Sequence, residues 1–134
     1  MDKGNRKGTI LIHESDSDLR RVIALHLEHL EWRVLQSKTV DFAIRLLERE
    51  EPDILIAEFD PPYTKKISLI DHFREINGNA SESILILMVL NHVEREILNQ
   101  QKPDIVFHKP FDVRNVSRKI DHLLGKRKHG SGHQ

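Results

Sequence analysis

The chain has 134 residues, which suffices for one domain with a hydrophobic core but not for two of ordinary size. Its 38% hydrophobic and 31% charged residues fit a globular protein in water, and no apolar run approaches the ~20 residues that cross a bilayer. A formal net charge of zero argues against a dedicated nucleic-acid-binding protein, and the lack of cysteine excludes disulfides and thiolate metal sites. We expect a cytoplasmic protein without membrane association.

Five short apolar runs follow one another along the chain, separated by stretches of helical periodicity. We predict strands over Thr9–His13, Trp32–Gln36, Asp53–Glu58, Ile84–Leu90 and Asp104–His108. Three of them are almost continuously apolar, as strands covered on both faces should be. After each run, apolar residues recur every three or four positions, which predicts five amphipathic helices.

Three helix starts carry capping signals. Ser15 with Asp18, and Asn91 with Glu94, have the spacing of a capping box, in which a short polar side chain and an acid three residues later satisfy the first free N–H groups. Asp112 is placed to cap the last helix. We therefore expect helices to begin just after Ser15, Asn91 and Asp112.

The chain shows no internal repeat and no composition change that would divide it. Gly125 follows the last apolar pair, where a helix end prefers glycine, and the residues after it are polar. We predict a single domain over residues 9–125, with flexible tails at residues 1–8 and 126–134.

Strict alternation of strands and helices predicts a doubly wound α/β fold with a five-stranded parallel sheet, most commonly in the strand order 2-1-3-4-5. Ligands of such sheets bind where the order reverses, beyond the ends of the first and third strands. The residues there are Glu14 and Ser15 on one side and Glu58 and Asp60 on the other, and Lys109 follows the fifth strand. This acidic cluster with one lysine suggests a site for a divalent cation and a phosphoryl group.

These features resemble the receiver domain of response regulators, of the CheY-like type, over residues 9–125. The resemblance is carried by the acid-bearing turn after the first strand, by PDILIAE at the end of the third, by Pro62 four residues beyond Glu58, and by the tripeptide Lys109–Phe111. It implies phosphoryl transfer to an aspartate at the end of the third strand, with Mg²⁺ held by acids after the first.

At the positions that matter most, this sequence departs from the family. Glu58 stands at the phosphoacceptor position, and Glu14 and Ser15 replace the acid pair, with Ser15 where a direct metal ligand is expected. Met88 replaces the hydroxyl residue that ends the fourth strand, and Val106 replaces the switch aromatic of the fifth.

Two lysines stand at positions to which the resemblance gives a role. Lys66 replaces the glycine expected in the loop after Pro62, whereas Lys109 and the proline after it keep their roles. We expect the longer Glu58 to reach Lys109 and form a charge-assisted pair that partly imitates the phosphorylated state.

We interpret the chain as a pseudo-receiver: a signalling and protein-interaction module without catalysis, cofactor or bound metal. The extra methylene of Glu58 displaces the nucleophilic oxygen, and Ser15 removes charge from a Mg²⁺ site that has few carboxylates, so Mg²⁺ binding is disfavoured. The alternative is a working phosphoacceptor that uses Glu58 or Asp60. A nucleotide-binding fold of the flavodoxin type is disfavoured, since no glycine-rich turn follows the first strand.

The partner surface implied by the resemblance consists of the fourth helix, the fifth strand and the fifth helix. We expect a protein partner there, with a homodimer left open and nucleic acid disfavoured, although basic residues gather at both chain ends. His13, His92 and His108 near the strand ends could bind zinc, but alternation of side chains along a strand argues against convergence, and we expect no metal site.

Overall fold

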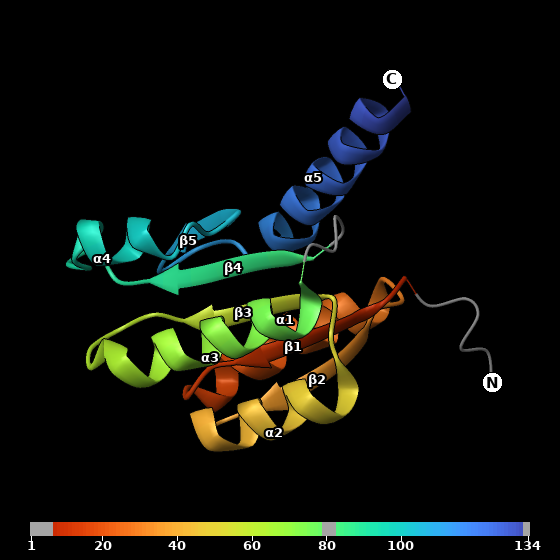
Figure 1. Ribbon diagram of the computed structural model, residues 1–134. Coiled ribbons are helices and arrows are strands. Elements are labelled where there is room, and N and C mark those ends of the chain that lie inside the picture. Colours follow the sequence, from red (N-terminus) through yellow and green to blue (C-terminus); the bar gives the residue numbers. More distant parts are fainter. Residues whose placement is uncertain (1–6, 79–82, 133–134) are drawn as a thin grey trace.

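The computed structural model describes residues 7–78 and 83–132, which form a five-stranded parallel sheet with helices on both faces (Figure 1). The elements are β1 (Thr9–His13), α1 (Ser17–His29), β2 (Arg33–Ser37), α2 (Val40–Glu50), β3 (Ile54–Glu58), α3 (Tyr63–Asn77), β4 (Ile84–Val89), α4 (Arg95–Gln100), β5 (Ile105–His108) and α5 (Arg114–Gly132). The strand order β2-β1-β3-β4-β5 confirms the predicted topology.

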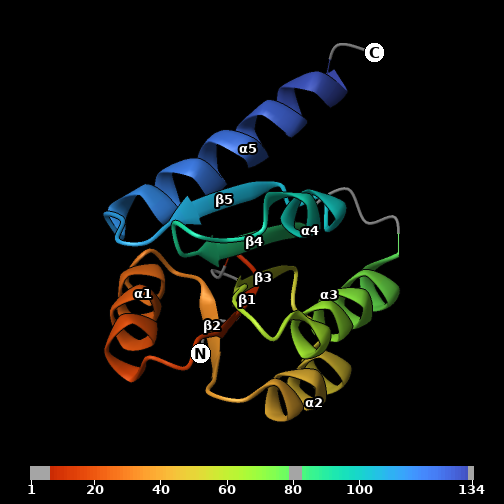
Figure 2. The same cartoon turned by 90° about the vertical axis from the view of Figure 1, so that its left-hand side faces the viewer.

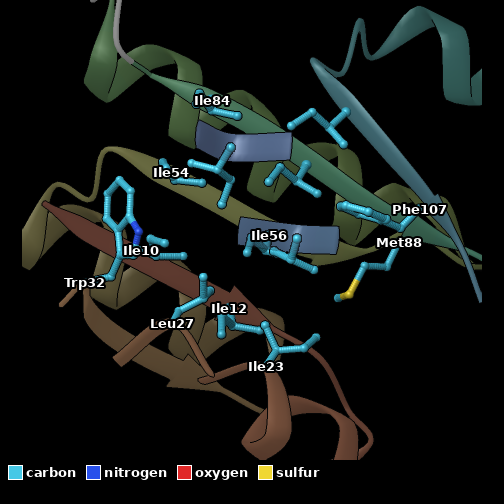
Figure 3. Packing of buried hydrophobic residues seen from close by; sticks show 14 of the residues in the cluster. Ile10, Ile12, Ile23, Leu27, Trp32, Ile54, Ile56, Ile84, Met88 and Phe107 are labelled. Carbon is cyan, nitrogen blue, oxygen red and sulfur yellow. The ribbon is translucent and has the colours of Figure 1, made fainter. Parts of the chain in front are cut away.

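The two faces of the sheet are separated by residue type along the three central strands. Isoleucines of β1, β3 and β4 enter the cluster under α1 and α5, and the leucines between them enter the cluster under α2, α3 and α4. This follows from the two-residue period of a strand, which sends neighbouring side chains to opposite faces. Figure 2 shows the two helical layers, and Figure 3 shows the isoleucine cluster with Trp32, Met88 and Phe107.

The start of α1 differs from its prediction. Asp16 is the N-cap, and its carboxylate accepts from the N–H groups of Asp18 and Leu19 at 3.0 and 3.2 Å. Ser15 does not cap because its N–H and its hydroxyl both donate to Glu58. The capping box assigned to Ser15 is therefore wrong by one position.

The start of α4 differs as well, whereas that of α5 agrees. Glu94 is the N-cap of α4 without a side-chain bond, and its own N–H donates to the Tyr63 hydroxyl at 3.3 Å. Tyr63 of α3 thus holds the loop before α4, and Asn91 is not the N-cap of that helix. Asp112 does cap, since its carboxylate accepts from the N–H of Arg114 at 2.9 Å.

α5 does not end at Gly125 but continues to Gly132 and projects beyond the sheet (Figure 1). The guanidinium of Arg127 donates to the Ser83 carbonyl at 2.9 Å and to the Asp104 carboxylate at 3.0 Å, which anchors the turn after Gly125. The tail predicted from residue 126 is therefore wrong up to residue 132, and residues 1–6 and 133–134 lie outside the described range. No helix in that range is long and apolar enough to cross a membrane.

Candidate functional site

The site lies at the carboxyl ends of β1 and β3, which are neighbours in the sheet. Glu14 and Ser15 follow β1, and Glu58 is the last residue of β3. Asp60 follows two residues later, and Lys109 follows β5. The strand order brings the predicted residues together, as expected for the switch point of a doubly wound sheet. Their pairing within the pocket differs from the prediction.

Glu58 is buried and fully engaged by its neighbours. Its Oε1 accepts from the N–H of Ser15 at 3.2 Å and from the Ser15 hydroxyl at 3.0 Å. Its Oε2 lies 3.5 Å from the ammonium of Lys66 and 3.8 Å from Nε2 of His13. No ion pair joins Glu58 to Lys109 among the described residues, so the predicted pair is wrong.

Lys66 is the functional residue that the sequence reasoning missed. It lies in the first turn of α3, and its Nζ is 2.5 Å from Asp60 Oδ1 while also facing Glu58. Its side chain is only 11% exposed. The resemblance predicts a glycine at this position and gives a lysine there no role. A lysine eight residues after a strand-end acid, at the start of a helix that packs beside the strand, is the signal that could have revealed it.

Lys109 instead pairs with Glu14. Its Nζ lies 2.7 Å from Glu14 Oε1, and the other carboxylate oxygen of Glu14 accepts from the N–H of Asp16 at 3.0 Å. Glu14 is 1% exposed, although its position just after β1 gave no sign of such deep burial. The loop after β5 therefore approaches the loop after β1. The ammonium of Lys109, which was expected to pair with Glu58, pairs with Glu14 instead.

The two buried glutamates differ in acidity. Burial and the hydrogen bond to the Glu58 carboxylate raise the pKa of Glu14 to about 7. Burial alone would raise the pKa of Glu58, but hydrogen bonds from Glu14 and Ser15 and the charge of Lys66 lower it to about 2. Burial also lowers the pKa of His13, so this imidazole is neutral at pH 7 despite the nearby carboxylate.

Met88 and Val106 lie at the strand positions assigned to them. Met88 faces Glu58 across the β3–β4 pair, is 1% exposed, and packs in the isoleucine cluster beside Phe107 (Figure 3). Val106 is half-buried and packs on the opposite cluster. Neither side chain has a hydroxyl, amide or charged group that could form a new hydrogen bond when the pocket changes.

The donor set does not fit a Mg²⁺ ion. Mg²⁺ requires oxygen ligands at about 2.0–2.1 Å in octahedral geometry, usually including carboxylates. Here an ammonium contacts Glu58 and Asp60, and a second one holds Glu14. Burial also raises the pKa of Glu14 to about 7, which weakens the negative charge that the pocket can offer a divalent cation. His92 and His108 are exposed, and the described ranges contain no group of three His, Asp or Glu residues arranged to hold a metal.

Comparisons with known proteins bear on the fold of the chain and not on the residues of this site. No family model matches the chain. It is 26% identical over 125 residues to "Probable transcriptional regulator ycf27" of Galdieria sulphuraria, covering 92% of this chain and 48% of that protein. The chain thus spans about half the length of this curated relative.

Solved receiver domains superpose closely. A response regulator receiver protein from Sinorhizobium medicae has a TM-score of 0.72 at 21% identity, covering 89% of this chain and 95% of the other. The receiver domain of Francisella response regulator 1452 gives 0.72 at 17% identity, covering 90% and 98%. Chemotaxis protein CheY4 of Vibrio cholerae gives 0.71 at 12% identity, covering 86% and 97%. The fold is therefore that of CheY-like receiver domains.

Proposed function

We propose that this chain is a phosphorylation-independent receiver domain, a cytoplasmic signalling module that binds a protein partner without catalysis of its own. The observation that carries the proposal is the position of Lys66, whose ammonium lies between Glu58 and Asp60. The chain itself supplies the positive charge that the resemblance would assign to a metal ion. A pocket balanced in this way needs neither a cation nor a phosphoryl group to keep its conformation.

The geometry at Glu58 supports the loss of phosphoryl transfer. A nucleophile must present a free oxygen in line with the leaving group, and transfer relies on positioning and on cations that neutralise the developing charge. One oxygen of Glu58 accepts two bonds from Ser15, and the other faces Lys66 and His13. A pKa of about 2 further indicates a carboxylate held strongly in its charged, bonded form.

Lys109 supports the same conclusion from the other side of the pocket. The resemblance gives this lysine the task of contacting the phosphoryl group. Here its ammonium is 2.7 Å from buried Glu14, and release would leave Glu14 without its cation in a low-dielectric site. The lysine that the resemblance predicts is thus present, but its ammonium forms an internal ion pair with Glu14.

The test is exposure of the protein to beryllofluoride with Mg²⁺, and separately to acetyl phosphate with Mg²⁺. We expect no saturable shift of the backbone amides of Ser15, Glu58 or Lys109 in ¹H–¹⁵N spectra, and no gain of phosphoryl mass. A triple variant, Ser15→Asp with Glu58→Asp and Lys66→Gly, is the matched control and should gain Mg²⁺-dependent shifts. Saturable shifts in the unmodified chain would refute the proposal.

A working phosphoacceptor remains the second candidate, and one observation favours it at Asp60. The Asp60 side chain is 39% exposed, against 8% for Glu58, so a phosphodonor could reach it. Peptide mapping of any phosphorylated product separates the candidates, because phosphate on Asp60 would establish this alternative.

For the partner surface we propose the face formed by α4, β5 and α5. Val93, Ile97 and Val106 are half-buried there, and Arg95 and Arg118 are exposed beside them. Because Val106 offers no aromatic ring to change rotamer, we expect a surface of constant shape. A homodimer through this face is the alternative, and light scattering at several protein concentrations distinguishes the two.

A further inference from the structure

The last strand of the sheet leaves a groove open beside α5. β5 pairs with β4 on one side, and no described strand pairs with its other side. The groove there has a volume of about 410 Å³ and is lined by Asp104, by Ile105 and Val106 of β5, and by Arg118, Lys119, His122 and Leu123 of α5. It lies away from the acidic pocket, along the edge of the sheet rather than at its carboxyl end.

Backbone groups of β5 point into the open edge. The N–H of Lys109 donates to the Val89 carbonyl at 2.8 Å, and alternate residues of a strand in a parallel pair face the same neighbour. The backbone N–H and C=O groups of Phe107 therefore face β4, whereas those of Val106 and His108 point away from it. A free edge of this kind is a template for one more strand.

The side chains around this edge form an apolar part and a basic part. Ile105, Val106 and Leu123 provide the apolar part. Arg118 and Lys119 provide the charge, and neither forms a salt bridge with a carboxylate within the described part of the chain; Arg118 bonds Asn115, and Lys119 lies 5.4 Å from the ring centre of Phe107.

The one acid at this end of the groove is already used internally. Asp104 accepts from the N–H of Leu85 at 2.8 Å and pairs with Arg127 at 3.0 Å. From Arg114 to Lys128, α5 contains a single acid, Asp121, among its lysines and arginines. The groove therefore has uncompensated positive charge beside unpaired peptide groups.

We propose that the β5 edge binds an acidic segment of a partner protein in extended conformation, which adds to the sheet as a sixth strand. This names the chemistry of the partner and rests on the proposed function as an interaction module. Main-chain hydrogen bonds to Val106 and His108 supply affinity, and alternate acidic side chains meet Arg118, Lys119 and His122. Nucleic acid fits less well, because phosphate oxygens can accept from the open N–H groups but have no donor for the open C=O groups, and they gain nothing from an apolar floor.

The experiment uses the full chain and a fluorescent peptide of alternating glutamate and valine. A second peptide carries N-methyl groups on alternate residues, which removes its strand-pairing N–H groups, and a third has lysine in place of glutamate. Anisotropy gives affinities, and amide hydrogen exchange read by NMR gives the protection of Val106 and His108.

We expect the acidic peptide to bind and to slow exchange at both amides. N-methylation should weaken binding about tenfold or more, the lysine peptide should not bind, and Arg118→Glu should weaken binding about five- to tenfold. Lys65→Glu, an exposed lysine of α3 on the opposite face, is the matched control and should change nothing.

Three results would overturn the inference: binding without added protection at Val106 and His108, equal binding of the methylated peptide, or protection that rises with protein concentration in the absence of peptide. Single-stranded DNA that binds while the acidic peptide does not would also overturn it. Repeating the titration with beryllofluoride and Mg²⁺ separates the two proposals, since a changed affinity would contradict phosphorylation independence but leave strand addition intact.

Discussion

The interior of the sheet and the pocket at its carboxyl end obey different rules. In the interior, isoleucines and leucines alternate between two clusters, and any apolar residue of similar size would satisfy the same packing. In the pocket, each carboxylate oxygen of Glu58 has its own partners, and replacing one of them would leave that oxygen without its hydrogen bond or ion pair. The fold can therefore be kept while the chemistry of the site changes completely, which is why fold and function need separate evidence.

Replacing a residue of the interior should have the largest effect on stability. Ile56 lies at the centre of the sheet with no exposed surface, so Ile56→Ala should lower the free energy of unfolding by about 2–5 kcal/mol through lost burial and the cavity left behind. Urea denaturation measures the change. An effect below about 1 kcal/mol would mean that the site collapses around the smaller side chain, and that the interior is less closely packed than described.

Removing Lys66 should have an intermediate effect. Lys66→Ala leaves Glu58 and Asp60 without their ammonium, and the loss should be about 1–3 kcal/mol because one of the two carboxylates is buried. Lys65→Ala, its exposed neighbour in the same helical turn, is the matched control and should stay within about 0.5 kcal/mol of the unmodified protein. Equal losses of stability in the two variants would show that Lys66 does not stabilise the carboxylates of Glu58 and Asp60.

A pH dependence that resides in Glu14 is the third expected effect. Its folded pKa, about 7, lies above the ordinary value of 4.5, so the folded state binds more protons and stability contributed by Glu14 is lost as pH rises from about 4.5 to 7. Glu14→Gln removes this loss. The stability of the variant relative to the unmodified chain should therefore increase between pH 5 and pH 7.5 in urea titrations. A constant difference across that range would show that Glu14 is ionised throughout.

A second pH effect has the opposite sign and a different window. The pKa of Glu58 is lowered to about 2, so its contribution to stability is present above pH 4.5 and is lost as pH falls toward 2. Because the windows of the two glutamates do not overlap and His13 is present in both proteins, the difference in stability between the Glu14→Gln variant and the unmodified chain from pH 5 to 7.5 reports Glu14 and not Glu58.

Predictions from local pattern succeeded where one physical effect decides the outcome. The short apolar runs located all five strands, and strict alternation of strands and helices predicted the parallel sheet and its order. The end of α5 was mispredicted because Gly125 permits termination but does not require it, and the bonds of Arg127 to distant Ser83 and Asp104 extend the helix. The caps of α1 and α4 were misplaced because Glu58 and Tyr63, both remote in sequence, hold the loops before them.

The sequence by itself determined the fold and the place of the site, because apolar periodicity and alternation act locally and converge on one topology. Only the tertiary structure decided which cation meets which acid. Lys66 and Lys109 carry the same charge, and what separates them is the direction from which α3 and the loop after β5 approach the pocket. An ion pair depends on distances of a few ångströms between residues far apart in the chain, and no pattern of spacing contains those distances.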